Sequence, residues 1–237
     1  MLNPSKGNMY DFVTHTWNTV KGVCPHGCEY CYMRRFGNQN PIRLDEKELK
    51  IDLGADNFIF IGSSCDMWAD EIPQPWIDRT IDRCCSFDNR YLFQSKNPAR
   101  INGYAEYLPK NSVIGTTIES NRYYKEMGRA PHPLDRADQM SSIRGCGLPY
   151  TLMVTIEPIM DFDFNAMVSM ISRIEPEWVN IGANTNHKVK LPEPAPEKIQ
   201  ELIFELEKFT KIKIKKNLNR WHNHTLDLTA KDSGKSA

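Results

Sequence analysis

The sequence predicts an α/β fold in which six β/α units wind into an open or partial barrel of the TIM-like kind. Short, wholly apolar segments alternate along the chain with segments whose apolar residues recur at helical spacing. Apolar runs of this kind are typical of strands buried on both faces of a parallel sheet. Polar residues follow nearly every apolar run, at the rim where such barrels place their active sites.

The first strand is predicted at residues 12–20, which are rich in β-branched and aromatic types. A loop, a turn or helix at residues 32–36 and a short charged helix at residues 46–51 follow it. Five further strands are predicted at residues 57–61, 90–94, 112–118, 150–156 and 178–181. Helices are predicted at residues 75–84, 101–107, 135–144, 164–174 and 194–209. Residues 211–216 are expected to add a short closing strand, and residues 1–9 to form a loose lead-in.

Length and composition predict one domain, assigned to residues 1–218, with a polar and flexible tail at residues 219–237. The 30 basic and 30 acidic residues balance, so net charge neither favours nor opposes a nucleic-acid partner. No apolar run is long enough to cross a membrane, and residues 1–10 lack the apolar core of a secretory signal. We therefore expect a cytoplasmic protein without a membrane partner.

Three of the seven cysteines lie close together as Cys24, Cys28 and Cys31, a C-x3-C-x2-C spacing. Thiolates bind soft metals and iron–sulfur clusters. Three thiolates on a four-iron cube leave one iron free to bind another molecule. The alternative is a zinc site completed by His26 or His15. The remaining thiols show no metal-ligand spacing, and Cys84, Cys85 and Cys146 are expected to be buried and free.

The stretch from Cys24 to Cys31, CPHGCEYC, resembles the signature of the radical S-adenosylmethionine (radical SAM) enzymes. The resemblance implies a 4Fe-4S cluster on the three cysteines, with S-adenosylmethionine chelating the fourth iron. It further implies reductive cleavage of that cofactor to methionine and a 5′-deoxyadenosyl radical, which abstracts hydrogen from a substrate. The electron would come from a reductant such as flavodoxin or ferredoxin. The implied fold is a partial barrel with the cluster loop after the first strand.

The same resemblance assigns tasks to polar residues at the strand ends. Tyr30 would lie beside the adenine. Ser63, Ser64 and Asp66 stand where the family binds the methionine end of S-adenosylmethionine, although Ser and Asp are also good helix N-caps. The ribose and carboxylate would be bound by Thr117, Glu119 and Asn121. Lys96, Asn184 and Lys216 complete the predicted polar rim.

Two further residues are candidates for the reaction itself. Glu157 ends an apolar run, where a carboxylate is costly unless it has a partner, so we expect a catalytic role. The segments HTWN, CPHGCEYCY, GSSCDMW and QSKNP together resemble a phage- and bacteria-associated radical SAM group near spore photoproduct lyase. Cys65 lies in the third of these segments. A cysteine donates hydrogen to the substrate radical in spore photoproduct lyase, and the resemblance gives Cys65 the same role.

Three functions compete at this stage. The first is a radical SAM enzyme acting on a nucleic-acid base or nucleotide. The second acts on a peptide, a protein glycyl site or a small metabolite, and the third is a zinc-stabilised binding module without enzymatic activity. Residues that fit phosphate contact or base stacking fit a solvated face or the core equally well: Arg34, Arg35, Lys188, Lys190, Lys215, Lys216, Tyr32, Trp68 and Trp76.

Overall fold

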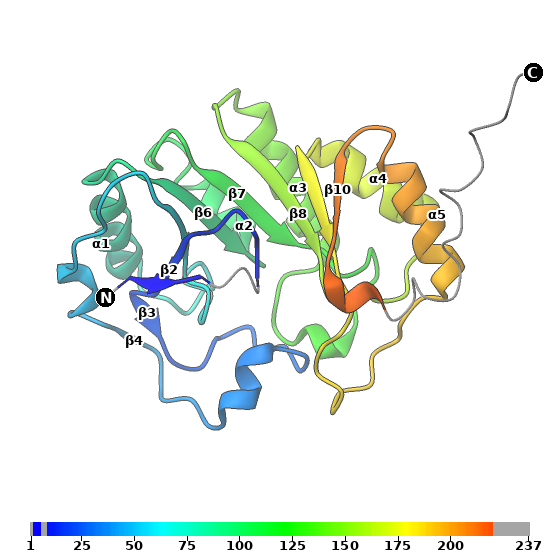
Figure 1. The fold of residues 1–237 in the computed structure, drawn as a ribbon, viewed down its shortest axis with the longest axis horizontal. Helices are drawn as coiled ribbons and strands as arrows, with labels where there is room; N and C mark the ends of the chain where they lie inside the picture. The colour runs from blue at the N-terminus through cyan, green and yellow to red at the C-terminus, as the bar shows by residue number, and fades with distance from the viewer. Residues whose placement is uncertain (1, 6–8, 220–237) are drawn as a thin grey trace, which may run out of the picture.

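The computed structural model describes residues 2–5 and 9–219, and a curved eight-stranded sheet forms its centre (Figure 1). The strand order in this part of the chain is β1-β2-β5-β6-β7-β8-β9-β10. The parallel strands are β2 (His15–Trp17), β5 (Phe58–Ile61), β6 (Arg90–Ser95), β7 (Val113–Thr117), β8 (Thr151–Ile156), β9 (Trp178–Ile181) and β10 (Lys211–Ile214). Neighbours in sequence are neighbours in the sheet, as a wound β/α barrel requires.

One helix lies between each pair of consecutive strands from β5 onward (Figure 1). These helices are α1 (Gln74–Cys85), α2 (Pro98–Asn102), α3 (Pro133–Gly145), α4 (Phe164–Ile174) and α5 (Pro196–Leu206). The predicted fold class, a partial TIM-like barrel, is confirmed, and the predicted closing strand is β10. The connection from β2 to β5 differs from the others because it carries the cysteine motif.

Successive side chains of each strand point to opposite faces of the sheet. On β5, Ile59 and Ile61 join the large core formed with the helices, whereas Phe58 and Phe60 face the other way. The second face, the inner face of the barrel, holds a smaller cluster to which residues 9–13 contribute. Its buried members are Tyr10, Val13, Phe58, Phe60, Leu92, Val113 and Met153. The amino-terminal segment therefore fills one end of the barrel interior.

Several predicted elements need correction. The first strand is shorter than residues 12–20: β2 ends at Trp17, and β3 (Val20–Lys21) leaves the sheet to pair with β4 (Arg43–Leu44). The predicted loose lead-in contains β1 (Asn3–Pro4), which pairs antiparallel with β2. Only a 3-10 turn, η2 (Glu48–Lys50), forms within residues 46–51.

The predicted burial of the isolated cysteines is wrong for two of three. Cys84 is buried, but Cys85 and Cys146 are exposed because they lie at and beyond helix ends. Helix α2 begins at Pro98, earlier than predicted, and residues 103–107 form turns. Residues 220–237 lie outside the described residues, so the flexible tail stays a prediction. In the described part of the chain, no helix combines the length and apolarity needed to cross a bilayer.

Candidate active site

The cysteine loop folds back on itself between β3 and η1 (Tyr32–Phe36). Gly27 N–H donates to the Cys24 carbonyl at 3.1 Å, and Cys31 N–H donates to the Cys28 carbonyl at 3.3 Å. Gly27 adopts φ +65°, a conformation that glycine reaches without penalty. These turns bring the thiols close enough for the charge of Cys24 to act on both other cysteines. All three thiols are free, with Cys28 buried and the other two half-buried.

A second loop, residues 124–129 after β7, supports the cysteine loop. Glu29 N–H donates to the Glu126 carbonyl at 2.9 Å, and the Cys28 thiol donates to the Met127 carbonyl at 3.3 Å. Gly128 lies directly under the cysteine loop, where an added Cβ would lie 2.2 Å from the His26 carbonyl oxygen. Only glycine fits there. The sequence does not reveal this support, because its residues carry no recognisable motif.

Two arginines bind the backbone carbonyls of the cysteine loop. Arg34 donates to the Cys28 and Gly27 carbonyls at 2.9 and 2.8 Å. Arg129 donates twice to the Pro25 carbonyl, at 2.9 and 2.6 Å. Both arginines bind the loop through its carbonyl oxygens and not through its thiols. The sequence suggested Arg34 as either a phosphate contact or a solvated residue, and nothing in it pointed to Arg129.

The donor set fits an iron–sulfur cube, in which each thiolate binds a different iron. Soft, neutral thiols predominate at the site. Burial is the largest influence on the pKa of Cys28, raising it to about 11, and burial also raises the pKa of Cys31. The positive charge of bound iron would lower the pKa of these buried thiols and allow them to ionise. Among the described residues, no three His, Cys, Asp or Glu side chains converge on a position for a single metal ion.

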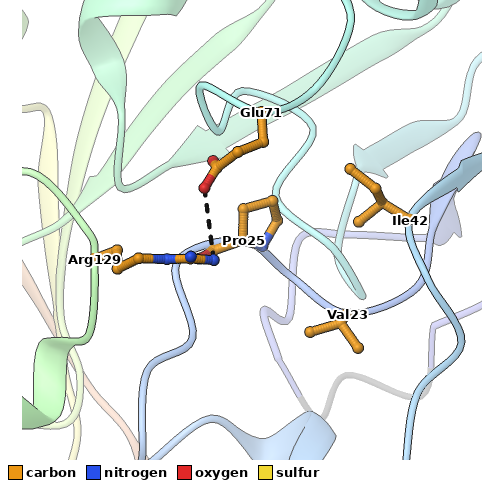
Figure 2. A pocket seen from close by; sticks show the side chains of 5 residues that line it. All are labelled: Val23, Pro25, Ile42, Glu71 and Arg129. Carbon is orange, nitrogen blue, oxygen red and sulfur yellow. Dashed lines mark hydrogen bonds and ion pairs between the residues drawn. The ribbon is translucent and has the colours of Figure 1, made fainter.

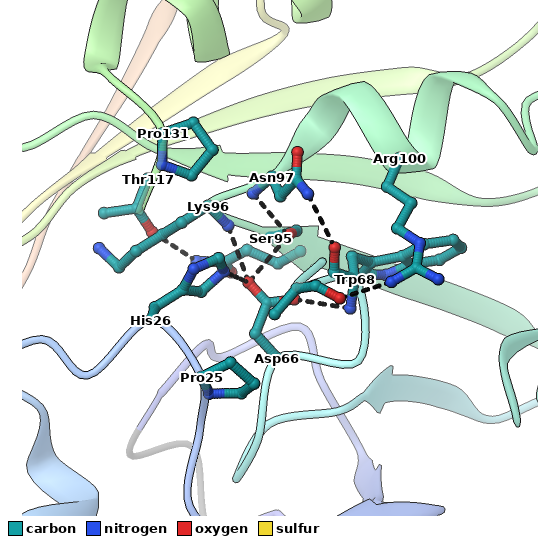
Figure 3. Close-up of polar contacts among 12 residues, drawn as sticks. Pro25, His26, Asp66, Trp68, Ser95, Lys96, Asn97, Arg100, Thr117 and Pro131 are labelled. Atoms are coloured by element: carbon teal, nitrogen blue, oxygen red, sulfur yellow. Dashed lines mark hydrogen bonds and ion pairs between the residues drawn. The ribbon is translucent and has the colours of Figure 1, made fainter. Parts of the chain in front are cut away.

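His26, inside the cysteine motif, connects the loop to the segment after β5 (Figure 3). Its Nε2 lies 2.8 Å from Asp66 Oδ2, and both side chains are largely buried. Asp66 also accepts hydrogen bonds from the Ser95 hydroxyl and from the backbone N–H groups of Lys96 and Trp68. Burial opposes charge on both partners, but their attraction raises the pKa of His26 and lowers that of Asp66. Both Asp66 oxygens are therefore occupied by protein donors.

Cys65 lies beside the cysteine loop. Its side chain is 1% exposed and forms a hydrogen bond with Cys24, which together with burial raises the pKa of Cys24 well above the usual thiol range. Ser63 and Ser64 precede it and are held by Asn18, at the end of β2. The Asn18 side chain donates to the Ser63 hydroxyl at 3.2 Å and accepts from the Ser64 N–H at 2.9 Å. The fold thus brings the predicted residues of this segment next to the cysteine motif.

Glu119 is completely buried beneath Tyr30. Its Oε1 accepts hydrogen bonds from the Tyr30 hydroxyl and from Lys96 Nζ, and its Oε2 accepts from Arg136 at 2.7 Å. Burial alone would raise the pKa of Glu119, but Arg136 and Lys96 outweigh it and lower the pKa to about 2. Nothing in the sequence points to Arg136, a fully buried cation among the apolar residues of α3.

A ladder of uncharged polar side chains lies on the inner face of the sheet above the apolar cluster. The Tyr10 hydroxyl donates to Gln94 Oε1 at 2.7 Å and lies 2.9 Å from Thr155 Oγ1. Gln94 in turn donates to the Thr117 hydroxyl at 3.2 Å. Thr117, predicted at the ribose, therefore belongs to this hydrogen-bonded ladder. Its members come from adjacent strands and from the amino-terminal segment.

Asn121, predicted at the cofactor, and Glu157, predicted as catalytic, lie in two separate clusters. Asn121 donates to Asp163 at 3.1 Å and accepts from its backbone N–H. Glu157, at the end of β8, contacts Lys215 Nζ at 2.9 Å and accepts from Asn217 at 2.8 Å. The partner that a carboxylate at a buried strand end requires is thus present. Of the predicted aromatics, Trp68 is fully buried in the core, whereas the Tyr32 hydroxyl donates to the Ser63 carbonyl.

Comparison with solved structures finds the same fold in spore photoproduct lyase. A cysteine-to-serine mutant of spore photoproduct lyase superposes with a TM-score of 0.61 over 91% of this chain and 79% of its own, at 13% identity. A double mutant of the same enzyme, with bound AdoMet and dinucleoside spore photoproduct, gives a TM-score of 0.54 at 12% identity, over 88% of this chain. The chain shares the fold of spore photoproduct lyase. It spans 64% of the length of the AdoMet-bound spore photoproduct lyase chain.

No protein-family model matches the sequence, and no curated protein matches it. At the identities found, the likeness to spore photoproduct lyase establishes the fold. It does not carry activity or substrate from one protein to the other. The predicted partial barrel of radical SAM type is therefore confirmed as a fold.

Proposed function

We propose that this protein is a radical SAM enzyme in which Cys24, Cys28 and Cys31 hold a 4Fe-4S cluster. One observation carries the proposal: a three-thiol loop, fixed against the loops after β5 and β7, in the fold of spore photoproduct lyase. When bound, the cluster and S-adenosylmethionine supply one-electron cleavage to methionine and a 5′-deoxyadenosyl radical, which removes hydrogen from the substrate. Protein residues bind, orient and shield the reactants.

Tyr30 and Lys96 form one wall of the proposed cofactor site. Lys96 Nζ donates to the Tyr30 hydroxyl at 3.0 Å, and both groups also bind Glu119. Because both Glu119 oxygens are taken by protein donors, we assign Glu119 to positioning of Tyr30 and Lys96 rather than to direct contact with the ribose. Asp66 has the same kind of role for His26. Ser63, Ser64 and Thr117 remain the candidates for direct cofactor contact, whereas the side chain of Asn121 is bound to Asp163.

The proposed substrate is a nucleic-acid base or nucleotide. The uncharged ladder of Tyr10, Gln94 and Thr155 supplies hydrogen-bonding groups of the kind that recognise base edges. Glu157 and Lys215 add a charged pair at the strand ends. We propose Glu157 as the catalytic carboxylate because, unlike the fully buried Glu119, its side chain stays 23% exposed. Salt-sensitive binding of DNA or RNA oligonucleotides distinguishes this substrate from a peptide, a protein glycyl site or a small metabolite.

The proposed reaction is tested by 5′-deoxyadenosine formation. Protein reconstituted with iron and sulfide under anaerobic conditions is reduced with dithionite and incubated with S-adenosylmethionine. We expect 5′-deoxyadenosine from the wild type and from Cys146→Ala, whose thiol is exposed and far along the chain, but none from Cys28→Ala. A wild-type protein that carries a full cluster and yields no 5′-deoxyadenosine contradicts the proposal. A single bound zinc would instead support the binding-module alternative.

We propose Cys65 as the hydrogen donor to the substrate radical. The contact of its thiol with Cys24, a proposed cluster ligand, supports this role. Cys65→Ala and Cys65→Ser should both leave 5′-deoxyadenosine formation intact and alter the product formed with substrate. Serine keeps a hydrogen-bonding group beside Cys24 but its O–H bond is too strong to donate a hydrogen atom readily. An unchanged product from Cys65→Ser excludes this role.

A further inference from the structure

Residues 9–13, which we call the strap, connect the two ends of the curved sheet. In the described part of the chain, the outermost strands β1 and β10 do not pair with each other. At one end, Thr14, directly after the strap, donates its N–H to the Phe58 carbonyl of β5 at 2.9 Å. At the other end, the strap contacts Lys213 and Lys215, in and just after β10. The strap therefore spans the open side of the partial barrel.

The strap runs along β10 in the direction opposite to the strand. Its first residue, Met9, accepts a hydrogen bond at its carbonyl from Lys215 Nζ. Further along, the Phe12 ring lies 4.7 Å from Lys213 Nζ and packs edge-on against Trp178, the first residue of β9. As the strap advances, its partners thus move from beyond the end of β10 back to the start of β9.

Tyr10 is the strap residue that reaches the polar ladder. Its ring belongs to the apolar cluster inside the barrel, and its hydroxyl meets Gln94 and Thr155. Gln94 is only half-buried. Because Tyr10 donates to Gln94 Oε1, it fixes which end of that amide accepts and which end donates. The position of the strap therefore determines how the ladder presents its hydrogen-bonding groups.

Lys215 holds the strap and the proposed catalytic carboxylate with a single ammonium group. Its Nζ lies 2.9 Å from Glu157 Oε2, donates to the Met9 carbonyl and lies 4.3 Å from the centre of the Tyr10 ring. An ammonium has three N–H donors. A carboxylate, a carbonyl and a ring face take up these donors, and the side chain is only 16% exposed. Lys215 is thus placed to hold protein groups rather than a substrate phosphate.

A pocket beside the cysteine loop is separate from the strap (Figure 2). Its volume is about 280 Å³, and it is lined by Val23, Pro25, Ile42, Glu71 and Arg129. Figure 2 shows the Arg129 and Glu71 side chains meeting across the pocket, 3.5 Å apart. Its lining includes no residue of the strap or of the ladder, so this pocket takes no part in holding Tyr10 or Glu157.

We propose that Lys215 is a positioning residue that couples substrate recognition to the catalytic carboxylate. It holds the strap, and with it Tyr10 and the ladder, while it also holds Glu157. This inference rests on the proposed function, which supplies the nucleic-acid substrate and the role of Glu157. Lys215 acts through the groups that it holds and does not contact the substrate. A base bound at the ladder therefore meets Glu157 in a fixed geometry.

Three lysines provide a matched series for testing this coupling. Lys211, Lys213 and Lys215 alternate along and just beyond β10, so they share one face of the strand. Lys213 contacts the strap, whereas Lys215 contacts both the strap and Glu157. Lys211 is exposed and serves as the control. Methionine replaces each lysine with a side chain of similar length and no charge.

The variants are compared by 5′-deoxyadenosine formation at increasing concentrations of single-stranded oligonucleotides of mixed sequence, with dithionite as reductant. Lys213→Met should raise KM about tenfold with a smaller effect on kcat, because it loosens the ladder alone. Lys215→Met should raise KM and also lower kcat about tenfold, since Glu157 loses its partner as well. Lys215→Arg should restore most of both, and Lys211→Met should match the wild type. A change in only one parameter for Lys215→Met, or the same changes in Lys211→Met, overturns the coupling.

Hydrogen exchange tests the hold on the strap without any substrate. The Val13 N–H donates to the Tyr10 carbonyl at 3.3 Å within the strap. In reconstituted protein, Lys215→Met should speed exchange of this amide about tenfold, while amides of helix α3 stay as protected as in the wild type. Equal exchange of the Val13 amide in both proteins overturns the proposal.

The two measurements also separate this inference from the proposed function. If the wild type forms no 5′-deoxyadenosine, the proposed function fails, while hydrogen exchange still decides whether Lys215 holds the strap. If oligonucleotides leave the wild-type rate unchanged, the nucleic-acid substrate fails, and the coupling of Lys215 to its recognition fails with it.

Discussion

Glu119 shows at the scale of single residues how a buried charge organises the site. It is fully buried, as is its partner Arg136, while Lys96 reaches it from the end of β6. Removing one member of a buried ionic group leaves the others desolvated and unpaired. The same carboxylate holds the Tyr30 hydroxyl. Stability and cofactor positioning therefore depend on one side chain.

Glu119→Gln is expected to lower the free energy of unfolding by about 3 kcal/mol at pH 7, because two cations lose their counter-charge. Denaturant unfolding of the metal-free protein measures this, with the exposed Glu106→Gln as control. The folded-state pKa of Glu119 is about 2, below the ordinary 4.5. Its stabilisation is therefore fully present above pH 4.5 and is lost as the pH falls toward 2. Equal stability of both variants at pH 7 contradicts this account.

The loop of residues 124–129 illustrates the scale of an element. It has no predicted motif, yet it contacts the cysteine loop through three backbone or thiol hydrogen bonds, from Glu29, Cys28 and Arg129. Gly128 permits this close approach, with φ +67° and no room for a side chain. Metal binding by the three cysteines should thus depend on an element that holds no ligand.

Gly128→Ala should lower the iron bound per chain on reconstitution, because its Cβ would displace the loop at His26. Gly147→Ala is a matched control, since Gly147 has the same φ of +67° and open space around it. Both changes carry the backbone penalty of about 1–2 kcal/mol for a left-handed alanine. Equal iron content in the two variants would show that the contact at residue 128 does not support the cluster loop.

The amino-terminal segment is a second element with a defined task. Tyr10 lies inside the barrel, 4% exposed, and its hydroxyl meets Gln94 and Thr155. Tyr10→Phe should lower the melting temperature, because it leaves buried polar groups without a partner, at a cost of about 1–3 kcal/mol. Tyr107→Phe, 68% exposed, should have no effect in the same scan. A melting temperature unaffected by Tyr10→Phe excludes this stabilising role.

At the scale of the molecule, the sheet could be predicted because its strands are continuous apolar runs. Residues 57–61 and 150–156 are examples, and each forms a strand within a residue of its expected bounds. The end of the first strand could not be delimited, because Val20 is a typical strand residue but pairs with Leu44 in another sheet. Local composition does not indicate with which distant segment a strand will pair.

The residues of the candidate site likewise fall into those that the sequence predicts and those that it does not. The metal-binding cysteines follow a local spacing, so the sequence could mark them. Contacts between distant segments could not be foreseen, such as Arg136 with Glu119 or His26 with Asp66. For this reason the sequence predicts Asp66 and Glu119 at the cofactor, whereas the structure shows both surrounded by protein donors. A position at a strand end indicates that a residue lies near the site, whereas its hydrogen-bond partners determine whether it can contact the cofactor.

The central claim is that three thiolates hold a four-iron cluster with one iron open to S-adenosylmethionine. The most direct measurement is the electron paramagnetic resonance spectrum of the reduced, reconstituted protein with and without S-adenosylmethionine. We predict about four irons per chain and a cluster signal that shifts when S-adenosylmethionine is added. A protein that holds a single zinc, or a cluster signal that S-adenosylmethionine leaves unchanged, would contradict the claim.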